Sequence, residues 1–120
     1  MNHALALPGA VLAIGLASTA LAAEHKADSS VAEGRKIALS VCWVCHEVGP
    51  GQPFRPMLDP PPPSFAEIAN RPGVSTAKLR RFLDTTHWDE ATIPMTMPSL
   101  GLTATQIDQL SRYILSQRRR

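Results

Sequence analysis

The sequence has very little cysteine: two residues, Cys42 and Cys45, among 120. A disulfide between such close positions constrains little of the chain, which argues against a disulfide-stabilised domain. Zinc needs about four protein ligands, and neither His25 nor His87 has Cys or His partners at zinc-finger spacing. A thioredoxin-like dithiol belongs in a βαβ unit, and no alternating strand pattern is present. These observations disfavour a structural disulfide, a zinc site and a redox dithiol as the role of the Cys-x-x-Cys pair.

Charged side chains are absent from the first 23 residues, MNHALALPGAVLAIGLASTALAA. An apolar opening that ends in small residues, with Ala20 and Ala22 in an A-x-A pattern, predicts a secretory signal peptide over residues 1–23. The positive n-region of such signals is missing, so an uncleaved membrane anchor is the alternative. Pro8 and the many Ala and Gly residues favour the cleaved signal. We therefore expect export to a bacterial periplasm, one folded domain over residues 24–120, and membrane contact only if the segment stays uncleaved.

The charges of the remaining chain are nearly balanced. Twelve Lys and Arg residues accompany ten Asp and Glu residues, a formal net charge of +2. This balance is too mild to indicate nucleic-acid binding. The basic residues Arg80, Arg81 and Arg118 to Arg120 are interpreted first as a solvated face, with steering of acidic partners as the alternative. A domain of this size has a thin hydrophobic core and often depends on a disulfide, a metal or a cofactor.

What the sequence does contain is a helical pattern. Three pairs have capping-box spacing, in which a Ser or Thr and a Glu or Gln three residues later bond each other's backbone amides: Ser30 with Glu33, Ser64 with Glu67, and Thr103 with Gln106. Ser75 predicts the N-cap of a further helix. The expected apolar faces carry Leu79, Phe82 and Leu83 in that helix and Ile107, Leu110 and Ile114 in the last one. We predict an all-α domain whose first helix begins at Ser30 and runs toward Cys42.

A proline-rich segment, GPGQPFRPMLDPPPPSF, separates these helices and holds seven of the eleven prolines. Proline fixes φ and removes a backbone donor, so we expect neither helix nor sheet here. The run from Pro60 to Pro63 could serve as a polyproline ligand for a partner. We favour a stiff loop that wraps another part of the molecule.

The motif CWVCH, Cys42 to His46, is explained in every part by covalent haem attachment. Two thiolates add across the haem vinyl groups to make thioethers, and the adjacent histidine is then held under the iron as an axial ligand. A fixed haem is also a large apolar body around which a small helical chain can fold. Trp43, between the cysteines, is expected to pack against the haem, with an apolar docking contact as the alternative.

A second axial ligand is offered by TIPMTMPSLGLT, which contains Met95 and Met97. A thioether sulfur favours reduced iron and raises the reduction potential, which suits an electron carrier. Side-chain alternation places both methionines on one side and does not choose between them. Pro98 biases Met97 toward an extended backbone. Met57, in the proline-rich loop, is a weaker candidate, and all of these methionines could instead fill gaps in an apolar region.

The order of these features resembles a class I cytochrome c: a capped helix, CWVCH, a proline-rich loop, a middle helix, Met-Pro and a final amphipathic helix with a tyrosine. The resemblance covers essentially all of residues 24–120. It implies that Cys42 and Cys45 form the thioethers, that His46 is the proximal ligand and that Met97 is the distal ligand.

The resemblance also implies two supporting contacts. A glycine on the first helix meets an aromatic residue on the last, positions that Gly34 and Tyr113 fill. A proline carbonyl accepts the ring N–H of the proximal histidine, and every proline from Pro50 to Pro63 remains a candidate. Trp88 is a candidate hydrogen-bond donor to a haem propionate, with ordinary core packing as the alternative.

The function we expect is single-electron transfer by an exported monohaem cytochrome c with haem c as its cofactor. Its partners would be redox proteins such as a periplasmic dehydrogenase, oxidase or reductase. One alternative is a dedicated cytochrome subunit of such a complex. A haem enzyme or gas sensor with an open sixth position is another, and a non-haem domain with a local disulfide is the third.

Overall fold

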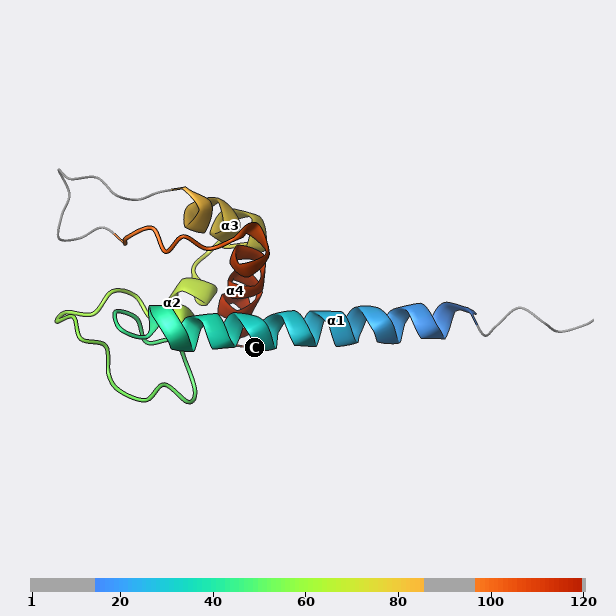
Figure 1. Ribbon diagram of the computed structural model, residues 1–120, viewed down its shortest axis with the longest axis horizontal. Coiled ribbons are helices and arrows are strands. Elements are labelled where there is room, and N and C mark those ends of the chain that lie inside the picture. The colour runs from blue at the N-terminus through green and yellow to red at the C-terminus, as the bar shows by residue number, and fades with distance from the viewer. Residues whose placement is uncertain (1–14, 86–96, 120) are drawn as a thin grey trace, which may run out of the picture.

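The computed structural model describes residues 15–85 and 97–119, with side chains from residue 21 onward. Its elements are α1 (Gly15–Ile37), a one-turn π-helix η1 (Ala38–Cys42), α2 (Phe65–Asn70), α3 (Thr76–Asp84) and α4 (Ala104–Ser116). The described ranges contain no strand, which agrees with the all-α prediction. The two longest helices, α1 and α4, cross each other, and the shorter α2 and α3 lie beside α4 (Figure 1).

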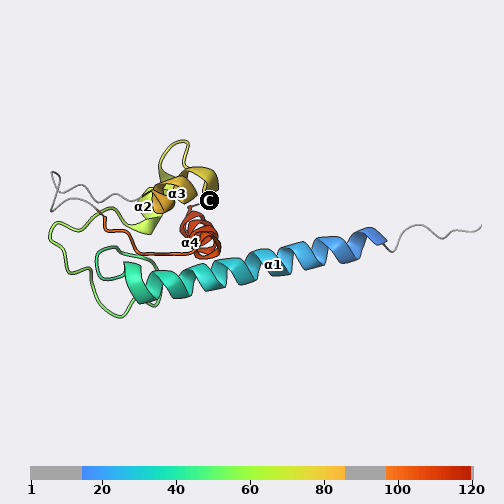
Figure 2. The same ribbon diagram turned by 45° about the horizontal axis from the view of Figure 1, so that its top comes forward.

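Helix α1 begins well before Ser30, so the first predicted capping box is wrong. No glycine or proline interrupts the chain between Gly15 and Gly34, and alanine is frequent there, so the helix continues without a cap. The side chain of Ser29 bonds the carbonyl of Lys26 at 2.9 Å instead of capping an end. Residues 21–29 are all exposed, and this half of α1 extends away from the other helices (Figure 2).

The other three predicted N-caps are confirmed. Ser64 and Glu67 form a reciprocal capping box at the start of α2, with bonds of 3.1 and 2.6 Å. Thr103 and Gln106 do the same for α4, at 3.2 and 2.9 Å. Ser75 accepts a bond from the amide of Lys78 and caps α3. The caps satisfy amides that a helix start leaves without partners, so each of these helices begins where its sequence predicts.

The crossing of α1 and α4 requires a glycine. A Cβ on Gly34 would overlap the carbonyl oxygen of Gln109 and lie 2.8 Å from Cβ of Tyr113. The predicted meeting of Gly34 and Tyr113 is therefore confirmed, and its physical cause is the close approach of two helix backbones. The predicted apolar stripe of α4 is buried in this core: Ile107, Leu110 and Ile114.

Helix α3 buries less of its expected face than the sequence predicts. Leu79 is buried and Leu83 is half-buried, but Phe82 is 50% exposed. The Phe82 side chain lines a surface hollow together with residues of its own helix and Thr85. Within the described residues, the predicted apolar face is thus packed on the core at Leu79 and Leu83 and open at Phe82.

The proline-rich segment is an irregular loop, as predicted, and it folds back on the CWVCH motif. The amide of Met57 donates to the carbonyl of Val44 at 2.8 Å, and the amide of Phe65 donates to the carbonyl of Glu47 at 2.9 Å. One bond thus joins the loop to the middle of the motif, and the other joins it to the residue that follows the motif. Within the part of the chain that the structure describes, no helix is both long and apolar enough to cross a bilayer.

Candidate haem-attachment site

The CWVCH motif winds into a tight turn at the end of η1. The amide of Trp43 bonds the carbonyl of Ala38 at 3.1 Å, which is the last π-helical bond. The carbonyl of Cys42 then accepts from two amides, Cys45 at 3.2 Å and His46 at 2.9 Å. Because one carbonyl accepts both bonds, Cys42, Cys45 and His46 lie in a single turn. The two thiol groups and the imidazole are therefore close to one another in the backbone.

No disulfide joins Cys42 to Cys45. Cys42 is buried, and burial, followed by the neighbouring Cys45, raises its pKa to about 12. Among the residues that the structure describes, no three His, Cys, Asp or Glu side chains are grouped so that they could hold a metal ion. These observations argue against the disulfide and the zinc site and leave both sulfur atoms available for thioether bonds.

The ring of His46 is fixed by Pro63. Its Nδ1 lies 2.8 Å from the carbonyl oxygen of Pro63. A carbonyl oxygen can only accept, so Nδ1 carries the proton and the lone pair of Nε2 is left to bind a metal. This bond selects Pro63 from the prolines that the sequence left open. The capping box of Ser64 starts α2 at the next residue and thereby holds the Pro63 carbonyl in place.

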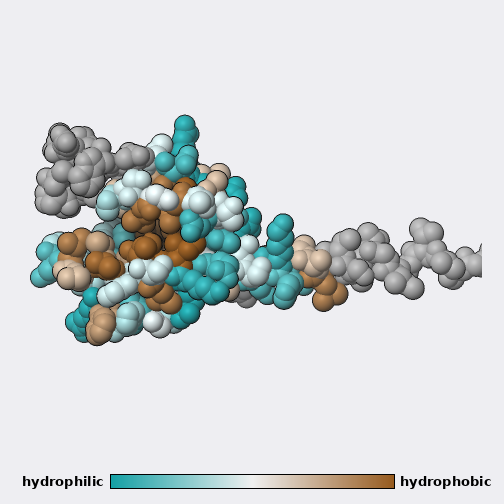
Figure 3. Space-filling view, viewed as in Figure 1, coloured by the Kyte–Doolittle hydropathy of each residue, from teal (hydrophilic) through white to brown (hydrophobic). Residues whose placement is uncertain are grey.

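The surroundings of this turn are apolar. The ring of Phe65 lies 5.8 Å from the His46 ring, centroid to centroid. Figure 3 shows hydrophobic side chains gathered at the middle of one face, over the region that holds α2 and α4 in Figure 1. Several large apolar side chains are also exposed, namely Val41, Val44, Phe54, Met57, Leu58 and Phe82. So much accessible apolar surface on so small a domain fits a chain that folds around a large apolar group such as haem.

The candidate distal ligands differ in their surroundings. Met97 is half-buried and lies in the extended segment 97–103 that leads into α4. Met57 is 76% exposed on the proline-rich loop, which agrees with its lower rank. Met95 and Trp88 lie outside the described residues. The structure therefore places Cys42, Cys45 and His46 together, and Met97 on a separate segment.

Trp43 is half-buried and packs against the hydrophobic core. Its ring also contacts that of Phe54, with centroids 6.0 Å apart and planes tilted by 42°. The proline-rich loop therefore covers part of the residue between the two cysteines. The indole is engaged with its own chain, and its expected packing against the haem stays a prediction.

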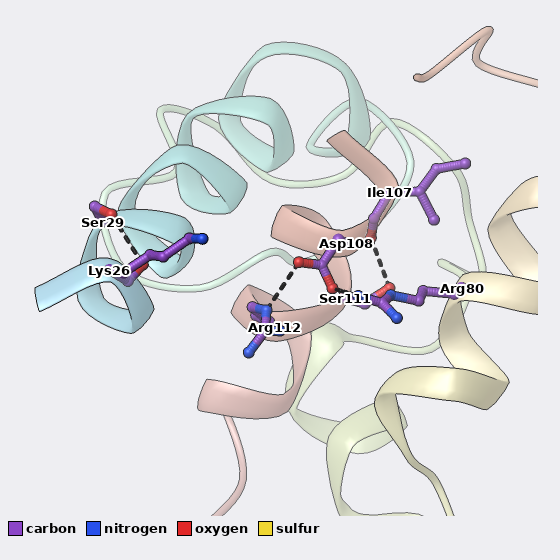
Figure 4. A network of polar contacts seen from close by, with 7 residues as sticks. All are labelled: Lys26, Ser29, Arg80, Ile107, Asp108, Ser111 and Arg112. Carbon is purple, nitrogen blue, oxygen red and sulfur yellow. Dashed lines mark hydrogen bonds and ion pairs between the residues drawn. The ribbon is translucent and has the colours of Figure 1, made fainter. Parts of the chain in front are cut away.

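Several basic residues that the sequence analysis placed on a solvated face have structural roles. Arg80 of α3 and Arg112 of α4 both pair with Asp108, and the Arg112 bond is 2.9 Å long (Figure 4). Arg118 donates to the carbonyls of Ala69 and Val74 at 3.0 and 3.2 Å. Arg80 lies 28 residues from Asp108, and Arg118 lies 49 residues from Ala69. No local sequence pattern reveals partners at such separations.

Two side chains near the motif make contacts that the sequence does not reveal. The side chain of Gln52 bonds the backbone of Val48 and Phe54 at 2.8 and 2.7 Å. Tyr113 donates its hydroxyl proton to the carbonyl of Val48 at 2.9 Å. A glutamine between glycine and proline carries no recognisable signal, and the tyrosine was assigned only to helix packing.

The comparisons with known proteins agree with this geometry. Residues 31–118 match the family model described as Cytochrome c. A protein named Cytochrome c-552, from Bradyrhizobium diazoefficiens, is 34% identical over 114 residues, which cover 95% of this chain and 97% of that protein. No solved structure matches the chain. The chain therefore belongs to the cytochrome c family, and it is an electron-transfer protein with covalently bound haem c.

Proposed function

We propose that this protein is an exported single-electron carrier in which Cys42 and Cys45 form the two thioethers and His46 and Met97 are the axial ligands. The observation that carries the proposal is the 2.8 Å bond from His46 Nδ1 to the Pro63 carbonyl. This bond leaves Nε2 of His46 available as the ligand atom, and His46 directly follows Cys45 of the Cys-x-x-Cys pair. The bound haem supplies the one-electron couple, and every other requirement falls on the chain.

The chain's first task is to keep the proximal ligand in one orientation. The Pro63 carbonyl fixes the tautomer of His46 and increases the basicity of its Nε2. Phe65, buried beside the ring, limits the ring's rotation and keeps water away from it. A ligand that does not reorient between oxidation states keeps the reorganisation on electron transfer small.

The second task is to supply a soft distal ligand. Met97 is half-buried, and its thioether sulfur would favour the ferrous state and raise the reduction potential. Pro98 follows it and keeps its backbone extended. With His46 and Met97 both bound to the haem, the chain would leave no open position for a substrate, which suits an electron carrier.

The rate of cyanide binding to the ferric protein tests the carrier against the alternative of an open sixth position. With both axial positions filled by the protein, cyanide must displace a ligand, so we expect binding to be slow at neutral pH. Met97→Ala should bind cyanide much faster, and Met57→Ala should behave like the wild type. Rapid binding by the wild type would support a haem enzyme or gas sensor instead.

Export by cleavage of residues 1–23 is part of the proposal. The exposed stretch 21–29 supports it, since Val31 is the first apolar side chain between residues 21 and 37 that packs on the core. The intact mass of the protein from a periplasmic extract should equal residues 24–120 plus one haem, allowing one residue either way. A mass that retains residues 1–23 would indicate an anchor.

We further propose that the partners are periplasmic redox proteins, namely a dehydrogenase, an oxidase or a reductase. The nearly balanced charge supports a carrier that dissociates readily from such partners. Purification from the native periplasm separates a free carrier from a fixed subunit. Elution at the size of the single chain is expected, and stable co-elution with one dehydrogenase would favour the subunit.

A further inference from the structure

The chain segment after His46 is fastened to the crossing of α1 and α4. Tyr113 of α4 donates its hydroxyl proton to the carbonyl of Val48 at 2.9 Å, in a buried position. Arg35 of α1 donates Nη2 to the carbonyl of Pro50 at 2.9 Å. One side chain from each of the two crossing helices therefore holds a carbonyl that lies within four residues of His46.

The turn itself is shaped to meet these two side chains. Gly49 and Gly51 both have positive φ, +119° and +85°. A Cβ on Gly49 would lie 2.9 Å from the Tyr113 hydroxyl, and a Cβ on Gly51 would overlap the Arg35 guanidinium. The positive φ favours glycine at both positions, and the close approach of the two side chains shows that they pack directly against the turn.

Gln52 holds the same segment from within the loop. Its Oε1 accepts from the amide of Val48 at 2.8 Å, and its Nε2 donates to the carbonyl of Phe54 at 2.7 Å. A longer contact of 3.5 Å joins Nε2 to the carbonyl of Trp43, between the two cysteines. Val48, which is fully buried, is thus held by its amide through Gln52 and by its carbonyl through Tyr113.

These contacts add to the backbone bond between Phe65 and Glu47, which holds only the first residue after His46. The amide of His46 bonds Cys42, but the chain that follows is loop and has no helix to fix its path. The Pro63 bond fixes the ring of His46 from one side only. A displacement of Val48 would therefore move the backbone of His46 relative to Pro63 and tilt the ring.

We infer that Tyr113, Arg35 and Gln52 are positioning residues that hold the Val48–Pro50 turn and thereby set the orientation of His46 toward the iron. The inference rests on the proposed function, in which His46 is the proximal ligand. None of the three residues needs to touch the haem. Their effect is transmitted through the backbone of Val48 and Pro50.

The test compares Tyr113→Phe, Arg35→Lys and Gln52→Glu with the wild type in the haem-loaded protein. Phenylalanine keeps the ring of Tyr113 and removes only its hydroxyl. Arg118→Lys is the matched control, because Arg118 also donates to two backbone carbonyls, those of Ala69 and Val74, which lie outside the attachment segment. The readouts are the midpoint potential, the paramagnetically shifted proton signals of the haem methyls and of His46, and the denaturant midpoint.

We expect the three variants to alter the shifted methyl pattern and to lower the midpoint potential, because a looser turn admits water that stabilises the ferric state. Arg118→Lys should lower stability and leave both the pattern and the potential at wild-type values. If the three variants lose stability but keep the wild-type pattern and potential, their contacts serve folding alone and the inference is wrong. Should Tyr113→Phe fail to fold, Gln52→Glu, whose side chain lies in the loop, decides the question.

The wild type separates this inference from the function on which it rests. A ferric wild type without a histidine-ligated spectrum would overturn the proposed ligation, and with it this inference. A histidine-ligated wild type whose positioning variants are unchanged would overturn this inference alone.

Discussion

Gly34 sets the distance between α1 and α4 by lacking a side chain. Its missing Cβ makes room for the carbonyl of Gln109 and for Cβ of Tyr113, which is 3% exposed. Close approach allows Tyr113 to reach Val48 with its hydroxyl. The absence of a side chain at Gly34 therefore affects the position of the segment that follows His46.

Replacing Gly34 tests this close approach. Gly34→Ala should lower the free energy of unfolding by about 3 kcal/mol, because overpacked helix contacts force the backbones apart. Gly101→Ala is the control: its φ is +61° and no atom of the described residues lies within 4 Å of a Cβ there, so only backbone strain of about 1 kcal/mol is expected. Denaturant unfolding of the haem-loaded proteins measures both. Equal losses would mean that the crossing adapts to the extra methyl group.

At the scale of elements, α2 is a short helix whose start determines the position of Pro63. Six residues are too few for an independent helix, so the capping box and packing on α4 must stabilise it. Arg118 adds a bond to the carbonyl of Ala69 near its end. The proximal histidine thus depends on the start of α2, which lies next to Pro63, whereas Arg118 holds the opposite end of the helix.

Loss of a cap should have different consequences in α2 and α4. Ser64→Ala and Thr103→Ala should each lower the free energy of unfolding by about 1 kcal/mol. Only Ser64→Ala should change the proton signals of the His46 ring, because Pro63 precedes that cap. The measurement is denaturant unfolding combined with proton NMR of the ferric protein. Unchanged His46 signals in Ser64→Ala would show that Pro63 does not depend on the capping box.

The contact of α3 with α4 predicts a defined dependence on pH. Burial alone would raise the pKa of Asp108, but hydrogen bonds from Arg112 and Arg80 outweigh it and hold the pKa below its ordinary value of 3.8. A lowered pKa stabilises the fold at pH values above 3.8, and this contribution disappears as the pH falls below 3.8 through the folded-state pKa.

Asp108→Asn isolates that contribution, because the amide keeps the shape and cannot ionise. The variant should be less stable than the wild type at neutral pH, and the difference should shrink below pH 3.8. Thermal unfolding at a series of pH values follows the difference. A constant difference across the series would mean that the ion pairs do not account for the stabilisation.

On the scale of the whole molecule, the sequence predicts the features that depend only on residues close together in the chain. The caps at Ser64, Ser75 and Thr103 and the CWVCH motif are local patterns, and each was recognised. Gly34 against Tyr113 was reached through family resemblance, since no local rule pairs residues so far apart. The start of α1 was predicted wrongly because Ser30 is a good cap in an uninterrupted run of helix formers.

The contacts that the sequence could not supply join distant segments. The sequence alone does not distinguish Pro63 from the other prolines of its loop. The fold places the Pro63 carbonyl beside His46, 17 residues away. Arg118 looked like part of a basic tail, yet it bonds carbonyls 44 and 49 residues earlier. Such partners are chosen by the packing of whole helices, which determines the positions of the residues around the haem-attachment turn.

The measurement that tests the account most directly is the near-infrared absorption of the ferric protein, for the wild type, Met97→Ala and Met95→Ala. We predict a low-spin spectrum with a sulfur-to-iron charge-transfer band in the wild type and in Met95→Ala, and loss of that band in Met97→Ala. A band that survives in Met97→Ala would contradict Met97 as the ligand. A high-spin wild type would contradict His/Met ligation altogether.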